Sequence, residues 1–91
     1  MNFNIPYELC LKLNILKNVE EEHKAIIQEH KILKGVKMDL EPQDATHTII
    51  IFTFDVNDYT YRHFNLCINP SKYETYINEL YDYNFNLLFN I

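Results

Sequence analysis

Residues 46–68 read THTIIIFTFDVNDYTYRHFNLCI, and this stretch decides the fold. Its first part, residues 46–56, combines β-branched and aromatic residues without Pro or Gly, which is typical of a strand. Asn57-Asp58 follows, and both residues tolerate the positive φ that a tight hairpin turn requires. Residues 59–68 then favour a second strand. The stretch therefore predicts an antiparallel β-hairpin.

Apolar residues in this hairpin do not keep to one face. In the first strand the even positions from 48 to 56 are the more apolar set, but Ile49 and Ile51 make its middle apolar on both faces. In the second strand Phe64, Leu66 and Ile68 share one side, opposite Tyr59, Tyr61 and His63. We expect the middle of the first strand to be covered on both faces.

A third strand is predicted just upstream. Apolar residues at 36, 38 and 40 alternate with charged residues at 37, 39 and 41, which indicates a strand with one buried face. Pro42 and the polar residues after it end the strand. Together with the hairpin this segment predicts a three-stranded antiparallel meander.

The N-terminal segment predicts a helix. Residues 6–34 contain no internal Pro or Gly, and Gly35, the only glycine, is placed to end the helix in a left-handed cap. From Leu16 the spacing alternates three and four, as in a coiled-coil seam. A continuous helix of this length would span about 43 Å, longer than a three-stranded sheet can cover. Asn14 and Asn18 leave two shorter helices as an alternative. The seam positions are 16, 19, 23, 26, 30 and 33.

A second helix is predicted after Asn69-Pro70-Ser71, in which Asn69 or Ser71 would be the N-cap. Its apolar stripe comprises Tyr73, Tyr76, Ile77 and Leu80. The predicted fold class is therefore α+β: an N-terminal helix, a three-stranded antiparallel meander and a C-terminal helix. We expect one domain, with residues 1–34 as its helical segment and 35–91 as its globular α+β region.

The amino-acid composition narrows the classes of protein to which this chain can belong. Of the 91 residues 47% are hydrophobic and 23% charged, so the chain can bury a core. Thirteen acids against eight bases give a net charge of -5, which argues against a nonspecific nucleic-acid binder. The longest apolar run, Ile49–Phe52, is far too short to span a membrane. With two cysteines and no basic leader followed by an apolar run, we expect a soluble intracellular protein with reduced thiols.

Residues able to carry chemistry are poorly spaced for it. His23 and His30 would lie about 10 Å apart along a helix, too far to share one metal ion comfortably. His63 and Cys67 would lie about 13 Å apart along a strand, too far to exchange a proton. Glu20–Glu22 is most simply a solvated charged face. We therefore expect no catalytic, metal-binding or cofactor-binding residues and no cofactor.

Seven Tyr and six Phe are more rings than one small core normally needs. Tyrosine is favoured where one end of the side chain is dry and the other wet, as in protein interfaces. Many of these rings belong to the domain's own core, and the surplus favours a protein-binding role.

From Phe52 onward the sequence resembles the globular ends of kinetochore RWD-fold proteins. It looks most like the spindle-pole-component pair at the inner end of the outer-kinetochore microtubule-attachment complex. The residues that carry the resemblance are Phe52–Val56, Tyr61–Pro70, Glu79-Leu80 and Asn84–Phe89, with Leu33–Val36 as the entry to the first strand. The family usually has four strands, where this sequence predicts three.

The resemblance implies a non-enzymatic subunit in the nucleus, at the kinetochore, that pairs with a second RWD subunit and docks onto centromere adaptors. We expect a homo- or heterodimer that contacts neither nucleic acid nor membrane directly. From amphipathicity, the coiled-coil contacts would be Leu16, Val19, Ile26 and Leu33. The globular contacts would be Tyr59, Tyr61, Tyr81, Phe85 and Phe89.

A small acidic inhibitor from a phage or mobile element, which blocks a host nuclease or signalling enzyme, is the alternative. It would act in the host cytoplasm, and it suits a short chain of net charge -5 if Met1 and Ile91 are the native ends. Such inhibitors often present carboxylates where nucleic acid would bind, and here the carboxylates could gather at the loops of the sheet. The candidates are Asp39, Glu41, Asp44, Asp55 and Asp58.

Overall fold

The computed structural model describes residues 2–89, which form one four-stranded antiparallel sheet and three helices. The strand order is β1-β2-β3-β4, so β1 and β4 are the two edges of the sheet. The elements in chain order are β1 (Asn2–Pro6), α1 (Tyr7–Lys12), α2 (Glu21–His30), β2 (Ile32–Pro42), β3 (His47–Val56), β4 (Tyr59–Ile68) and α3 (Lys72–Phe89). The α+β class is thus confirmed.

The predicted hairpin is present at the predicted positions. Asn57 and Asp58 have φ of 48° and 69°, the left-handed pair that a two-residue hairpin turn requires. From Val56↔Tyr59 to His47↔Ile68, β3 and β4 pair over the whole length of both strands. The turn fixes this register, because it places the first pair directly beside the two-residue loop.

The predicted single helix over residues 6–34 is wrong, and so is the count of three strands. The alternative of two shorter helices is confirmed, with the break at Asn14. Residues 2–6 pair with β2 as a fourth strand, and the following residues form two short helices with an irregular segment between them. Asn14 and Lys31 have φ of 58° and 61°, which an α-helix cannot continue through. Lys31 is the left-handed C-cap of α2. The three-four spacing arose because apolar residues of several short elements pack onto one sheet.

Gly35 does have positive φ, at 69°, but it lies inside β2 and does not end a helix. The β1–β2 register shifts between Phe3 and Ile5, and Gly35 lies opposite this bulge. Its N–H donates to Asn4 Oδ1 at 3.3 Å. The glycine therefore serves a β-bulge, where a left-handed residue is commonly needed.

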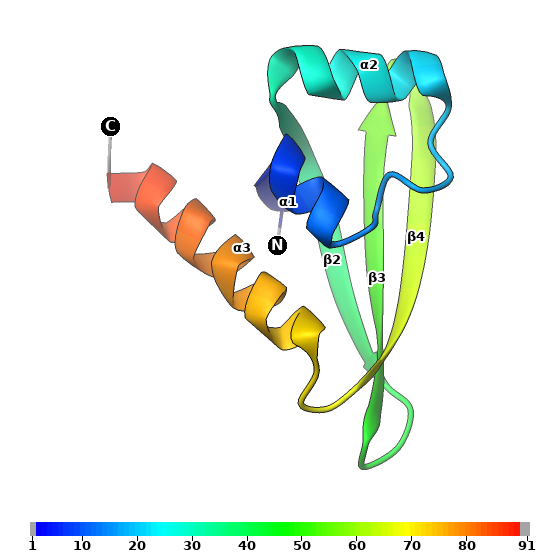
Figure 1. Ribbon diagram of the computed structural model, residues 1–91, viewed down its shortest axis with the longest axis vertical. Helices are drawn as coiled ribbons and strands as arrows, with labels where there is room; N and C mark the ends of the chain where they lie inside the picture. Colours follow the sequence, from blue (N-terminus) through cyan, green and yellow to red (C-terminus); the bar gives the residue numbers. More distant parts are fainter. Residues whose placement is uncertain (1, 90–91) are drawn as a thin grey trace.

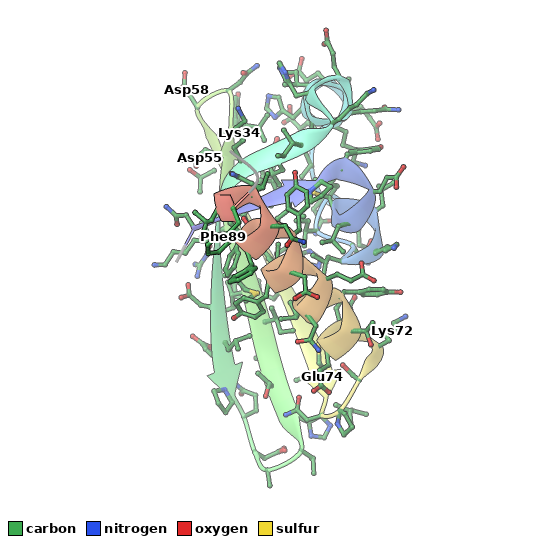
Figure 2. All side chains as sticks on the ribbon, turned by 90° about the vertical axis from the view of Figure 1, so that its left-hand side faces the viewer. Lys34, Asp55, Asp58, Lys72, Glu74 and Phe89 are labelled. Atoms are coloured by element: carbon green, nitrogen blue, oxygen red, sulfur yellow. The ribbon has the colours of Figure 1, made fainter. Side chains whose placement is uncertain are left out.

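All three helices lie on the same side of the sheet, which leaves the other face without a helix (Figures 1 and 2). α2 crosses the end of the sheet near the β3–β4 turn, and α3 runs diagonally toward β1 and α1 (Figure 1). The core lies between the helices and the sheet. Its fully buried large side chains are Phe52, Ile5, Leu13, Ile15, Leu80 and Val36.

α3 begins as predicted and is anchored by its first half. The Tyr73 N–H donates to Ser71 Oγ at 3.2 Å, which makes Ser71 the capping residue. Leu80 is fully buried, and Tyr73, Tyr76 and Ile77 pack against the core. Within residues 2–89, none of the helices combines the length and the apolar character needed to cross a bilayer.

Candidate functional site

One exposed apolar surface lies on the sheet face that bears no helix. Phe64, Leu66 and Ile68 of β4 are 55%, 66% and 62% exposed, although each is a large apolar side chain. They pair across the strands with Ile51, Ile49 and His47 of β3. Ile51 is buried but stands outside the main core cluster, because its side chain lies on this second face. We call Ile49, Ile51, Phe64, Leu66 and Ile68 the open sheet surface.

A second exposed apolar surface lies at the far end of α3. Phe85, Leu88 and Phe89 are 60%, 69% and 72% exposed, and Tyr81 is exposed beside them. The rings of Phe85 and Phe89 contact each other, with centroids 4.7 Å apart. Figure 2 labels Phe89 at the C-terminal end of α3, and Figure 1 shows this end of the helix extending beyond the strands of the sheet. We call Tyr81, Phe85, Leu88 and Phe89 the α3 tip.

The nine predicted partner contacts divide into two groups. In the N-terminal segment Leu16, Val19 and Leu33 are buried in the chain's own core and Ile26 is half-buried. Packing on the sheet therefore occupies the residues that were expected to form a coiled-coil seam.

The predicted contacts in the globular region are more accessible. Tyr81, Phe85 and Phe89 come together in the α3 tip, and Tyr59 is exposed near the β3–β4 turn. Tyr61 is half-buried, and its hydroxyl is hydrogen-bonded to Nδ1 of His23.

The open sheet surface was not expected as a site. The alternation of Phe64, Leu66 and Ile68 is visible in the sequence, but so is the alternation of the opposite set. Only the positions of the helices show which face of the strand stays uncovered (Figure 2). The missing helix on the outer face is therefore what identifies this surface.

The five carboxylates expected to gather at the loops are split between opposite ends of the sheet. Asp55 and Asp58 lie at the β3–β4 turn, near α2 (Figure 2). Asp44 lies in the loop between β2 and β3, at the other end of β3. A ten-residue strand between them spans about 33 Å. The expectation that these carboxylates gather in a single acidic patch is therefore wrong.

Asp44 is instead a structural residue of its loop. Its Oδ1 accepts from the N–H groups of Thr46 and His47, both at 2.8 Å, and from the Thr46 hydroxyl at 2.9 Å. The Thr46 N–H, its hydroxyl and the His47 ring lower the pKa of Asp44 from 3.8 to about 2.

Neither cysteine is placed as a nucleophile. Cys10 is fully buried, and burial raises its pKa from 9.0 to about 12. Burial also raises the pKa of Cys67, whose Sγ lies 3.9 Å from the backbone oxygen of Asn65. His63 Nε2 is hydrogen-bonded to Asn65 Oδ1 at 3.1 Å and thus not to Cys67. Both thiols are therefore protonated at neutral pH.

A pocket lies between the start of α3 and the sheet. Its walls are mostly apolar, and Glu74 is the only carboxylate among its lining residues. The lining is Leu40, Thr48, Ile50, Cys67, Asn69, Pro70, Ser71, Tyr73, Glu74 and Ile77.

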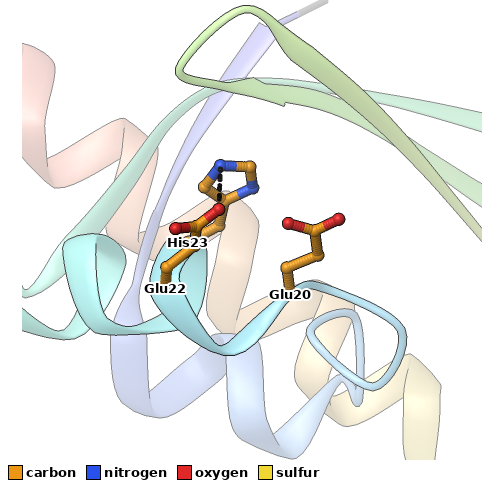
Figure 3. A group of neighbouring side chains, drawn as sticks. All are labelled: Glu20, Glu22 and His23. Atoms are coloured by element: carbon orange, nitrogen blue, oxygen red, sulfur yellow. Dashed lines mark ion pairs between the residues drawn. The ribbon is translucent and has the colours of Figure 1, made fainter.

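Glu20, Glu22 and His23 form one group (Figure 3), although the sequence predicted a solvated face for Glu20–Glu22 and paired His23 only with His30. Their ligand atoms lie within 4.8 Å of one another, a spacing that one cation could bridge. His23 is only 3% exposed; Tyr61 occupies its Nδ1, and its Nε2 lies 3.9 Å from Glu22 Oε1. The group sits at the N-terminal end of α2, where carboxylates stabilise the helix dipole without any metal.

Comparison with known proteins identifies no relative: no protein-family model, curated protein or solved structure matches the chain. The candidate site therefore rests on its own geometry.

Proposed function

We propose that this protein is a non-enzymatic protein–protein interaction subunit that binds its partner through the α3 tip. The single observation that carries the proposal is the exposure of Phe85, Leu88 and Phe89, each 60% or more. Clustered aromatic side chains with a polar surround are typical of the centre of a protein interface.

The way α3 is anchored supports this function. Asn84 ties the helix to the edge of the sheet: its Nδ2 donates to the Asn4 carbonyl at 2.9 Å, and its Oδ1 accepts the Asn4 N–H at 2.8 Å. The residues beyond Asn84 extend from a fixed point. A preorganised helix loses little conformational entropy when a partner covers it.

A shallow hollow runs along the same surface. It is lined by Phe3, Tyr81, Asp82, Asn84, Phe85 and Leu88, and Phe3 is otherwise a core residue. An apolar side chain of a partner could enter there and touch the edge of the core. Such a pocket beside exposed aromatics is the arrangement that binding hot spots use.

The resemblance to kinetochore RWD-fold proteins gives the proposal its more specific form. In that form the partner is a second RWD-type subunit, the pair docks onto centromere adaptors, and the protein acts in the nucleus at the kinetochore. What supports this specific form is that three of the predicted globular contacts, Tyr81, Phe85 and Phe89, lie on one exposed surface.

The test is affinity capture from the source cells with matched variants. The tip variant carries Phe85→Lys and Phe89→Lys, and the control carries Leu11→Lys and Leu40→Lys, which are also exposed apolar positions. We expect proteins retained by the wild type and the control to fall at least tenfold with the tip variant. Equal retention by all three chains would overturn the proposal. Captured kinetochore subunits would support the specific form, and their absence from the tip-dependent set would remove it.

A further inference from the structure

The two edge strands of the sheet, β1 and β4, differ in how readily each could pair with a strand of another chain. β1 is five residues long, contains a bulge and ends at Pro6, and Asn84 hydrogen-bonds to its backbone. These features are how proteins prevent an edge strand from pairing with another chain. β4 has ten residues, no proline and a continuous register with β3. Its length and regularity make β4 an edge prepared for pairing.

The free backbone groups of β4 belong to the same residues as its exposed apolar side chains. In an antiparallel ladder the N–H and C=O of successive residues point alternately toward the partner strand and away from it. The turn makes Val56↔Tyr59 the first inward pair, and Asn69 N–H, which donates to Thr46 O at 2.8 Å, continues the inward set of odd residues. The outward set is therefore Thr60, Arg62, Phe64, Leu66 and Ile68.

These outward groups have no partner within the described chain. Among residues 2–89, none of the backbone hydrogen bonds outside helices and ladders involves any of the five. Their side chains are all exposed. The edge thus offers a row of unpaired donors and acceptors over the length of the strand.

The charges on β4 favour pairing with a second copy of the same strand. The protein carries a net charge of -5, yet β4 contains no carboxylate, and Arg62 is its only Lys or Arg. The guanidinium carbon of Arg62 lies 5.2 Å from the Phe64 ring centroid, so this charge is already held over an aromatic face. A second β4 strand therefore meets this edge without the repulsion that the rest of the acidic surface would cause.

We propose that β4 pairs antiparallel with β4 of a second copy, about a two-fold axis at Phe64, so that two four-stranded sheets become one continuous sheet. This register pairs Phe64 with Phe64, Arg62 with Leu66 and Thr60 with Ile68. All five outward residues of each strand find a partner, and the two Arg62 side chains stay about 13 Å apart along the strand. The interface is isologous, as in most homodimers, and it leaves the α3 tip free.

Cysteine crosslinking tests the register. Phe64→Cys places two thiols on one antiparallel pair with Cα atoms about 5.5 Å apart, within the range of a disulfide. Leu66→Cys is the matched control, because each Leu66 faces Arg62 and the two thiols are about 13 Å apart. On mild oxidation we expect a covalent dimer of the Phe64→Cys chain, and none of the Leu66→Cys chain or of the wild type, whose two cysteines are buried. Crosslinking of Leu66→Cys alone, or of neither variant, would overturn the proposal.

Light scattering of the purified full chain tests the assembly itself. We expect the wild type to reach twice 11.0 kDa as its concentration rises. Phe64→Glu places two carboxylates on the axis and should shift the monomer–dimer midpoint at least tenfold upward, with circular dichroism unchanged. Phe85→Glu, the matched control on the α3 tip, should dimerise like the wild type. A wild type that stays at 11.0 kDa, or a Phe64→Glu chain that still dimerises, would refute β4 pairing and leave the capture experiment on the α3 tip unaffected.

Discussion

The side chain of Asn84 hydrogen-bonds to the outer backbone groups of β1, as the backbone of a neighbouring strand would. Its amide accepts the Asn4 N–H at 2.8 Å and donates to the Asn4 carbonyl at 2.9 Å, so both free backbone groups of this edge residue are satisfied by one side chain. Asn4 in turn accepts from Gly35 across the bulge. A chain of three polar contacts thus joins α3, β1 and β2.

We predict that Asn84→Ala lowers the free energy of unfolding by about 2 kcal/mol, because it leaves a half-buried donor and acceptor without partners. Asn86→Ala, on an exposed position of the same helix, controls for the change in helix propensity and should stay within about 0.5 kcal/mol of the wild type. Urea unfolding of the three chains measures the difference. Equal midpoints for Asn84→Ala and Asn86→Ala would show that the contact contributes nothing.

Asp44 gives its loop a defined dependence on pH. Its pKa in the fold, about 2, lies below the ordinary value of 3.8. The ionised carboxylate therefore stabilises the fold above about pH 4, and this contribution disappears as the pH falls toward 2. We predict that Asp44→Asn is less stable than the wild type at pH 7 and that the gap closes near pH 2. Thr46→Val, which keeps the backbone donor, should show a smaller gap. Thermal unfolding across this pH range measures both, and a pH-independent gap would contradict the assignment.

At the scale of elements, the hairpin and α3 could be predicted because residues within or next to each element determine where it turns or begins. Asn57-Asp58 sets the turn and the register, and Ser71 caps the helix that follows. Position within the strand also fixes which residues share a face. What the strands alone could not show is which of the two faces the helices would cover.

The N-terminal third could not be predicted in the same way. Its apolar spacing of three and four satisfies a coiled-coil seam as well as it satisfies two short helices and a strand packed on a sheet. Tertiary contacts decide the outcome: β1 becomes a strand because it pairs with β2, and Leu16 and Val19 are buried in the core. The positive φ of Asn14 falls on a residue type that adopts this conformation readily, which is why a break there could be considered from the sequence, whereas nothing in the sequence marks Lys31.

A substitution of Gly35 tests whether the β1–β2 bulge requires a residue with positive φ. A Cβ added there meets no atom within 4 Å, so the whole cost of Gly35→Ala comes from its φ of 69°. We predict a loss of about 1 kcal/mol in the free energy of unfolding. Lys34→Ala, the exposed neighbour in the same strand, should change stability by less than about 0.5 kcal/mol. Guanidinium unfolding measures both variants, and a neutral Gly35→Ala would mean that the bulge can adopt a conventional backbone.

Across the described molecule, two groups of apolar side chains stand out. One group fills the core between the helices and the sheet, and the other comprises most of the exposed large apolar side chains, which lie on the open sheet surface and the α3 tip. A side chain that remains largely exposed contributes little to folding, since the hydrophobic effect scales with the area removed from water. The second group therefore contributes little to the stability of this fold, which is consistent with the proposed association with other chains.

This division predicts that substitutions in the two halves of α3 change the free energy of unfolding by very different amounts. Leu80→Ala should lower the free energy of unfolding by about 3 kcal/mol, because Leu80 is fully buried and the substitution opens a cavity. The double variant Phe85→Lys, Phe89→Lys should change it by no more than about 0.5 kcal/mol, because both rings are mostly exposed. Urea unfolding at a concentration where the chain is monomeric compares them. If the double variant lost stability as Leu80→Ala does, the α3 tip would belong to the core of this chain, and no partner would be needed to explain its aromatic residues.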